Sequence, residues 1–231
     1  TITSNVQGAE LQLGEAMTPI TLNYTSQAGG ASFYNGNGSS WLVKDIKVGK
    51  NSGTQEFIGV VLGDYLFFPA DDGTNGTELW RSDGTEAGTV MVKDINTGPS
   101  WDSDIDPYHL TAMGDSIYFV ADNGSTQQEL WRSDGTEAGT VMLMSFPDIG
   151  TQQYVFTPPF AIMGDAFYFN GNDGTHGREL WRSDGTEAGT VMVKDINPGV
   201  AGNNILDYAV MGDNLYFQAY SPLYGSELWK T

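Results

Sequence analysis

The chain has 231 residues, with ten Lys and Arg against 29 Asp and Glu, and a formal net charge of −19 at pH 7. Such an acidic chain repels phosphate backbones and anionic lipid surfaces, so nucleic acid is not an expected partner. It contains no Cys, which excludes disulfides and thiolate metal sites, and no apolar run of the roughly 18 residues that direct membrane insertion requires.

Residues 1–38 lie outside the pattern that governs the rest of the chain. The alternating apolar run at 20–24 predicts one strand, and the Gly-, Ser- and Asn-rich stretch after it predicts a linker. We expect this extension either to pack on the domain formed by residues 39–231 or to donate its strand to a neighbouring molecule.

The rest of the chain is repetitive, with a period close to 50 residues. Glu-Leu-Trp recurs at 78–80, 129–131, 179–181 and 227–229, so its Trp residues are 51, 50 and 48 positions apart. Gly-Asp recurs with the same spacing, at 63–64, 114–115, 164–165 and 212–213. Val-Lys-Asp-Ile occurs at 43–46, 92–95 and 193–196, with a diverged Leu-Met-Ser-Phe at 143–146. A fixed period of this length indicates a repeat architecture.

Each period contains four short β-rich runs bounded by Gly, Asp or Asn, which predict four strands. Four-stranded units repeated around an axis are typical of a β-propeller, so the predicted fold is an all-β, four-bladed propeller. The last repeat stops after its third strand, whereas an unmatched run precedes the first repeat at 41–46. We expect this run to complete the last blade and close the ring, and an open four-sheet solenoid is the alternative.

The string Glu-Leu-Trp-Arg-Ser-Asp-Gly-Thr-Glu-Ala-Gly-Thr-Val-Met occurs at 78–91, 129–142 and 179–192. It resembles the ELWxxDGT repeat of large secreted or surface-attached prokaryotic proteins, over about 190 residues of this chain. The last copy keeps only Glu-Leu-Trp-Lys-Thr. The resemblance implies an extracellular location and a scaffold or adhesion-like setting, and it supplies no catalytic motif.

The loops that join one predicted blade to the next differ in every repeat, which favours them as the ligand-binding face. The candidate ligand-binding residues on this face are Trp101, Asp102, Asp104, Asp106, Tyr108, His109, Tyr154, Asp207 and Tyr208. Aromatic rings beside carboxylates suit a sugar or a cationic ligand, and alternate acidic residues suit Ca²⁺. For the loop that carries Trp101, a solvated acidic loop is the interpretation that we favour, because exposed acidic loops are common. We assign no function to the opposite face, whose turns are nearly identical between repeats.

A second set of carboxylates follows the second strand of each repeat. The candidate metal ligands are Asp71, Asp72, Glu78, Asp122, Glu129, Asp173 and Glu179. These oxygens would suit Ca²⁺, the only cofactor that we expect. Asp-Gly and Asn-Gly are also ordinary hairpin turns, and the turn interpretation is favoured because the spacing is not that of an EF-hand loop.

Taken together, these patterns predict an extracellular, non-enzymatic binding or scaffold module on the cell surface, with carbohydrate or other surface proteins as partners. The two His residues lie in different loops, without a Ser nucleophile elbow or a His-Glu-x-x-His motif, so we expect no enzyme. Two alternatives stay open. One is an assembly subunit that self-associates through residues 1–30, and the other is a carbohydrate-active enzyme that uses the ligand-face carboxylates.

Overall fold

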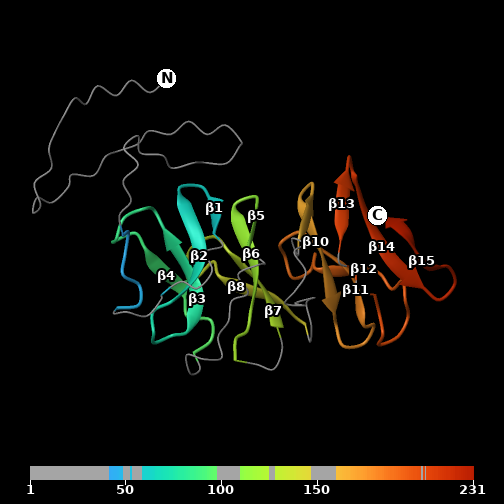
Figure 1. Ribbon diagram of the computed structural model, residues 1–231, viewed down its shortest axis with the longest axis horizontal. Coiled ribbons are helices and arrows are strands. Elements are labelled where there is room, and N and C mark those ends of the chain that lie inside the picture. Colours follow the sequence, from blue (N-terminus) through green and yellow to red (C-terminus); the bar gives the residue numbers. More distant parts are fainter. Residues whose placement is uncertain are drawn as a thin grey trace, which may run out of the picture. The chain divides into compact units, whose positions relative to one another are not determined.

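The computed structural model describes the chain in several stretches (Figure 1). These are residues 42–48, 53, 59–97, 110–124, 128–146, 160–203, 205 and 207–231. The chain divides into two compact units, Thr1–Ser40 and Trp41–Thr231, and all described residues belong to the second. The strand and linker predicted within 1–38 therefore lie outside the described residues.

In the described part of the chain every regular element is a β-strand, which confirms the all-β prediction. The first sheet contains β1 (Val60–Leu62), β2 (Tyr65–Asp71), β3 (Thr77–Ser82) and β4 (Val90–Lys93). The second contains β5 (Thr111–Met113), β6 (Ser116–Ala121), β7 (Gln128–Ser133) and β8 (Val141–Phe146). The third contains β9 (Ala161–Met163), β10 (Ala166–Asn172), β11 (Arg178–Ser183) and β12 (Val191–Lys194). The last contains β13 (Tyr208–Met211), β14 (Asn214–Ser221) and β15 (Gly225–Lys230).

Neighbouring strands of each sheet are antiparallel and follow chain order, so each sequence repeat folds into one sheet. The Gly-Asp marker forms the tight turn between the first two strands. In the first sheet Leu62 pairs with Tyr65 across it, and Gly63 has a φ of 59°. A positive φ at the first central position is what a two-residue type II′ hairpin turn needs, and Gly supplies it without steric cost.

The near-identical loop between the third and fourth strands is held by a network of short polar side chains. In the first sheet the hydroxyls of Ser82 and Thr89 lie 2.7 Å apart, and Thr89 Oγ1 donates to Thr85 O at 2.6 Å. Asp83 accepts the backbone N–H and the hydroxyl of Thr85. The same bonds recur in the second and third sheets, so this motif is explained by turn structure.

Buried side chains fill the space between successive sheets according to one rule. The Leu of each Glu-Leu-Trp belongs to the same core cluster as the Trp of the following sheet. The pairs are Leu79 with Trp131, Leu130 with Trp181, and Leu180 with Trp229. The Lys of Val-Lys-Asp-Ile adds a cation over the same Trp, since Lys93 Nζ lies 5.8 Å from the Trp131 ring and Lys194 Nζ 5.5 Å from the Trp229 ring.

The two ends of the series of four sheets differ from the interfaces between successive sheets. The described residues of the last sheet form three strands, and Leu228 is 75% exposed, whereas its counterparts Leu79, Leu130 and Leu180 are fully buried. Residues 42–48 form no strand and lie against the first sheet, where Lys44 Nζ donates to Thr89 O at 2.8 Å. The sheets are not closed into a ring, and the predicted pairing of 41–46 with the last blade is not observed.

Candidate functional site

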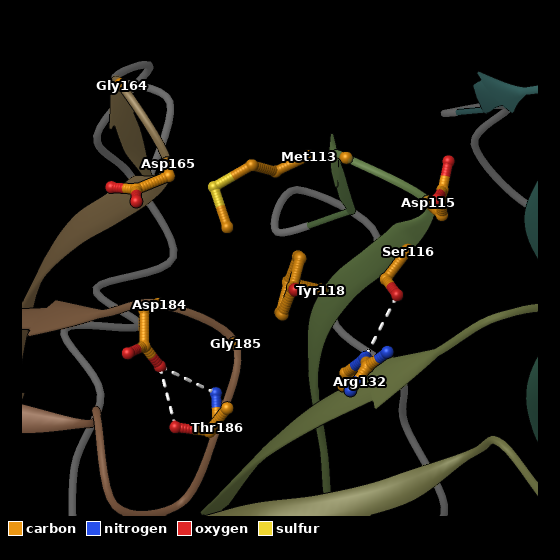
Figure 2. A pocket seen from close by; sticks show the side chains of 11 residues that line it. Met113, Asp115, Ser116, Tyr118, Arg132, Gly164, Asp165, Asp184, Gly185 and Thr186 are labelled. Carbon is orange, nitrogen blue, oxygen red and sulfur yellow. Dashed lines mark hydrogen bonds between the residues drawn. The ribbon is translucent and has the colours of Figure 1, made fainter.

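A cavity of about 500 Å³ opens between the second and third sheets (Figure 2). It lies beside the Gly-Asp turns and the loop after β11. The second sheet contributes Met113, Ser116, Tyr118 and Arg132, and the third contributes Asp165 and Asp184, among others. We call this cavity the inter-sheet cleft. Its volume is within the range of small-molecule sites.

The wall from the second sheet combines a guanidinium with a buried phenol. Arg132 Nε donates to Ser116 Oγ at 2.9 Å. Tyr118 is 4% exposed, its ring centroid lies 4.7 Å from that of Phe167, and burial raises the pKa of its hydroxyl, which therefore stays protonated at neutral pH. This wall thus offers a fixed cation and a neutral hydroxyl.

The wall from the third sheet carries carboxylates. Asp184 accepts the hydroxyl of Thr186 at 2.7 Å and its backbone N–H at 3.0 Å. The side-chain hydrogen bond from Thr186 is the main reason that the pKa of Asp184 lies below its usual value, so this group is anionic at neutral pH. The side chain of Asp165 is almost fully exposed, with Arg182 Nη2 at 3.6 Å.

Gly185 allows the two walls to meet at the base of the cleft. It has a φ of 88°, and a Cβ at this position would overlap the hydroxyl of Tyr118. The loop after β11 therefore approaches Tyr118 as closely as it does only because residue 185 lacks a side chain.

The corresponding place between the first and second sheets is filled. Tyr65 stands where the second sheet has Ser116, and Arg81 stacks on its ring with Cζ 4.8 Å from the centroid. Arg81 Nη1 then donates across the interface to Gly135 O at 2.7 Å. In the next interface Ser116 has no ring to support this conformation, and Arg132 bonds to Ser116 within its own sheet instead. This difference between repeats accompanies the open inter-sheet cleft.

The same interface also diverges at the Val-Lys-Asp-Ile position. Met144 and Phe146 of β8 occupy the places that Lys93 and Ile95 hold in the first sheet. Phe146 packs edge-to-face on Trp181, with ring centroids 5.0 Å apart and an interplanar angle of 89°. An apolar aromatic contact thus replaces the cation over Trp that the neighbouring interfaces use.

Most of the predicted ligand-face residues lie outside the described residues: Trp101, Asp102, Asp104, Asp106, Tyr108, His109 and Tyr154. Asp207 is described and exposed. Tyr208 packs against the core cluster between the third and last sheets, donates to Ile205 O at 3.4 Å, and has a pKa raised well above its usual value by burial.

The glutamates predicted as metal ligands bind the backbone. Glu78 is 1% exposed and accepts the N–H groups of Ile95 and Asn96 at 3.0 and 3.2 Å. Burial raises its pKa to about 7, and burial likewise raises the pKa of Glu179, which accepts Asn197 N at 2.9 Å. Glu129 accepts Asn123 N at 3.0 Å.

The predicted aspartate ligands form the turns themselves. Asp71 and Asp122 each accept the backbone N–H of the Gly two residues ahead, at positions 73 and 124. Asp72 and Asp173 each accept the N–H groups two and three residues ahead. These are Asx turns, the geometry of the turn interpretation. Across the described stretches, no three His, Asp or Glu residues are grouped so as to hold a metal ion.

The inter-sheet cleft was not predicted from the sequence. It lies on the face whose repeated turns gave no reason to expect individual function. The available signals were the replacement of Tyr65 by Ser116 and of Lys93 by Met144 between copies, both in the second repeat. Within the described residues, no helix is long and apolar enough to cross a membrane.

Comparison with known proteins gave matches among solved structures alone. No protein-family model and no curated protein matches the sequence. The chain resembles two crystal structures of puromycin hydrolase, each at 19% identity, with TM-scores of 0.47 and 0.45. It also resembles a structure from a study of two prolyl endopeptidases, at 17% identity and a TM-score of 0.40. Each match covers 73% of this chain and 25% of the other, so the chain spans about a quarter of the length of these proteins.

These matches correct two predictions. The structures that this chain resembles are named as hydrolases and peptidases, which contradicts the predicted non-enzymatic adhesion or scaffold module and the expectation that the chain is no enzyme. At these identities the likeness concerns the fold and assigns no reaction to this chain. The ELWxxDGT resemblance, the extracellular location, the partners and Ca²⁺ stay predictions from the sequence.

Proposed function

We propose that this chain is a propeller domain that binds a small polar ligand with a cationic group in the inter-sheet cleft. The observation that carries the proposal is the contrast between two equivalent interfaces. Arg81 fills the first by reaching Gly135 O, whereas the second stays open over about 500 Å³. Divergence at one copy of a repeated scaffold is where individual function is expected.

The charge of the cleft determines whether a cationic or an anionic ligand is favoured. Asp115, Asp165 and Asp184 line it together with Arg132, and Arg182 Nη2 lies 3.6 Å from Asp165, so three carboxylates outnumber two guanidinium groups. The chain as a whole carries −19, which raises the local concentration of cations and lowers that of anions. A ligand with an ammonium or guanidinium group is therefore favoured over an anionic one.

Calorimetric titration with hexylammonium tests this proposal. We expect saturable binding to the wild type and at least about a tenfold loss in the Ser116→Tyr variant, which restores the residue that fills the first interface. Asn214→Tyr, at the same position of the last sheet, is the matched control and should bind as the wild type does. Absence of saturable binding to the wild type, or equal binding to Ser116→Tyr, would contradict the proposal.

We also propose that the four sheets close into a four-bladed ring when Val43–Ile46 pairs with β15. Two observations support this, one at each end of the series of sheets. Ile46 packs with Trp80 and Phe68, and Lys44 Nζ lies 6.0 Å from the Trp80 ring. Residues 42–48 thus contact the first sheet as the fourth strand of a preceding sheet would. At the other end of the series, Leu228 of β15 is exposed, because among the described residues no fourth strand lies beside it.

Cysteine cross-linking tests the ring. Leu79 pairs with Lys93, and Leu180 with Lys194, so closure places Leu228 opposite Lys44, within disulfide reach. Because the chain has no Cys, a Leu228→Cys and Lys44→Cys double variant can form only this bridge within one molecule. We expect an intrachain disulfide on oxidation, seen as a monomer of altered mobility without reductant.

The control pairs Leu228→Cys with Lys93→Cys, whose position is occupied within the first sheet. It should form no intrachain bridge. Free thiols or exclusively intermolecular bridges in the Leu228 and Lys44 variant would contradict ring closure.

A further inference from the structure

We infer that the ligand of the inter-sheet cleft is dipolar, with its cationic group at the carboxylates of the third sheet and a carboxylate of its own at Arg132. This inference rests on the proposed function and specifies its ligand class. It is carried by two fixed charges of opposite sign on the two walls, Asp184 beside the third sheet and Arg132 on the second. Asp165 also lies on the wall of the third sheet, where Arg182 pairs with it, and Asp115 lies on the wall of the second. Figure 2 shows Asp184 and Arg132 on opposite sides, with Met113 and Tyr118 between.

Arg132 is held in a conformation that leaves its terminal nitrogens for a ligand. Its Nε–H is used by Ser116 Oγ, which fixes the plane of the guanidinium. Among the described residues, Arg132 donates a hydrogen bond to Ser116. Arg81, by contrast, donates from Nη1 to Gly135 O. The two Nη groups form the edge that binds a carboxylate through parallel hydrogen bonds.

The opposite wall is an acceptor for an ammonium group. Asp184 uses Oδ1 for both bonds to Thr186, which keeps the carboxylate anionic and in one orientation. Asp165 forms an ion pair with Arg182, whose Nη2 lies 3.6 Å away, and its side chain is solvent-exposed. An ammonium group would thus meet the fixed, anionic carboxylate of Asp184, with the ion-paired Asp165 beside it.

Neither a simple cation nor a simple anion satisfies both walls. A cation alone leaves Arg132 without a carboxylate, and an anion alone meets the field of the three aspartates. A molecule with an ammonium at one end, a carboxylate at the other and an aliphatic spacer meets both, and its spacer can lie against Met113 and Tyr118. Amino acids, ω-amino acids and short peptides belong to this class.

Three probes of matched chain length separate the possibilities: ε-aminocaproate, hexylammonium and hexanoate. We expect ε-aminocaproate to bind the wild type at least about tenfold more tightly than hexylammonium, and hexanoate to bind more weakly than either. A series of ω-amino acids of increasing length should then show one preferred spacing. Equal affinity for ε-aminocaproate and hexylammonium would overturn the dipolar ligand while leaving the proposed cation site standing.

Charge-removing variants assign the two ends. Arg132→Gln should abolish the preference for ε-aminocaproate over hexylammonium, whereas Asp184→Asn should weaken both. Arg81→Gln and Asp83→Asn make the same changes at the equivalent positions of the first repeat, outside the cleft, and should leave the affinities unchanged. An unchanged preference in Arg132→Gln would overturn the inference, and failure of every cationic probe to bind the wild type would instead overturn the proposed function.

Discussion

Glu78 predicts a measurable dependence of stability on pH. It is 1% exposed, and burial raises its pKa from the ordinary 4.5 to about 7 despite two backbone N–H donors. Each pKa unit corresponds to about 1.4 kcal/mol, so this difference is worth about 3 kcal/mol. Because the folded state holds the proton more tightly than the unfolded state, this contribution to stability is fully present below pH 4.5 and is lost as the pH rises through about 7.

The Glu78→Gln variant isolates this contribution from the other acidic groups. The amide of Gln accepts one hydrogen bond fewer than the carboxyl group at every pH, and it is uncharged at every pH. The stability of Glu78→Gln relative to the wild type should therefore rise by about 3 kcal/mol between pH 4.5 and about pH 8, measured by urea unfolding. Glu86→Gln, an exposed site in the same repeat, is the control and should show no such trend. A pH-independent difference between Glu78→Gln and the wild type would refute the reasoning.

Gly84→Ala should cost about 1 kcal/mol for its positive φ alone, because a Cβ there meets nothing. Gly185→Ala at the same φ should cost clearly more, because its Cβ would overlap the hydroxyl of Tyr118 and crowd the ring, so Tyr118→Phe should relieve only part of the added cost. Lys93→Met should lower the free energy of unfolding by about 1 kcal/mol, since it removes the hydrogen bond to Thr140 O and the cation over Trp. Thermal unfolding in Ca²⁺, Mg²⁺ and chelator tests the predicted Ca²⁺: a Ca²⁺-selective rise in Tm would support it, and equal Tm values would contradict it.

The sheets were predictable from the sequence because repetition marks them. The predicted second-strand run at 65–68 lies in β2 (Tyr65–Asp71), and each Glu-Leu-Trp lies in the third strand of its sheet. Local chemistry determines these elements: β-branched and aromatic runs favour strands, and Gly-Asp favours a two-residue turn. Strand order then follows from short connections between antiparallel neighbours.

The inter-sheet cleft was not predictable in the same way, because it depends on a side-chain conformation and not on a motif. Arg81 and Arg132 occupy identical positions in identical strings, so no pattern within the repeat separates them. Their conformations differ because Tyr65 offers a ring and Ser116 a hydroxyl, at the position directly after the Gly-Asp turn. Whether such an exchange opens a cavity depends on the neighbouring sheet, which the sequence does not place in space.

Ring closure depends on a pairing between distant segments, and Glu227 gives it an independent test. In the first sheet Glu78 is buried and accepts the N–H groups of Ile95 and Asn96, whereas Glu227 at the same position of β15 is exposed. Pairing of Val43–Ile46 with β15 would cover Glu227 and bring the N–H groups of Ile46 and Lys47 to it. Burial would then raise its pKa as it does for Glu78. In a closed ring Glu227→Gln should therefore gain stability relative to the wild type as the pH rises, whereas in an open one the difference should stay constant.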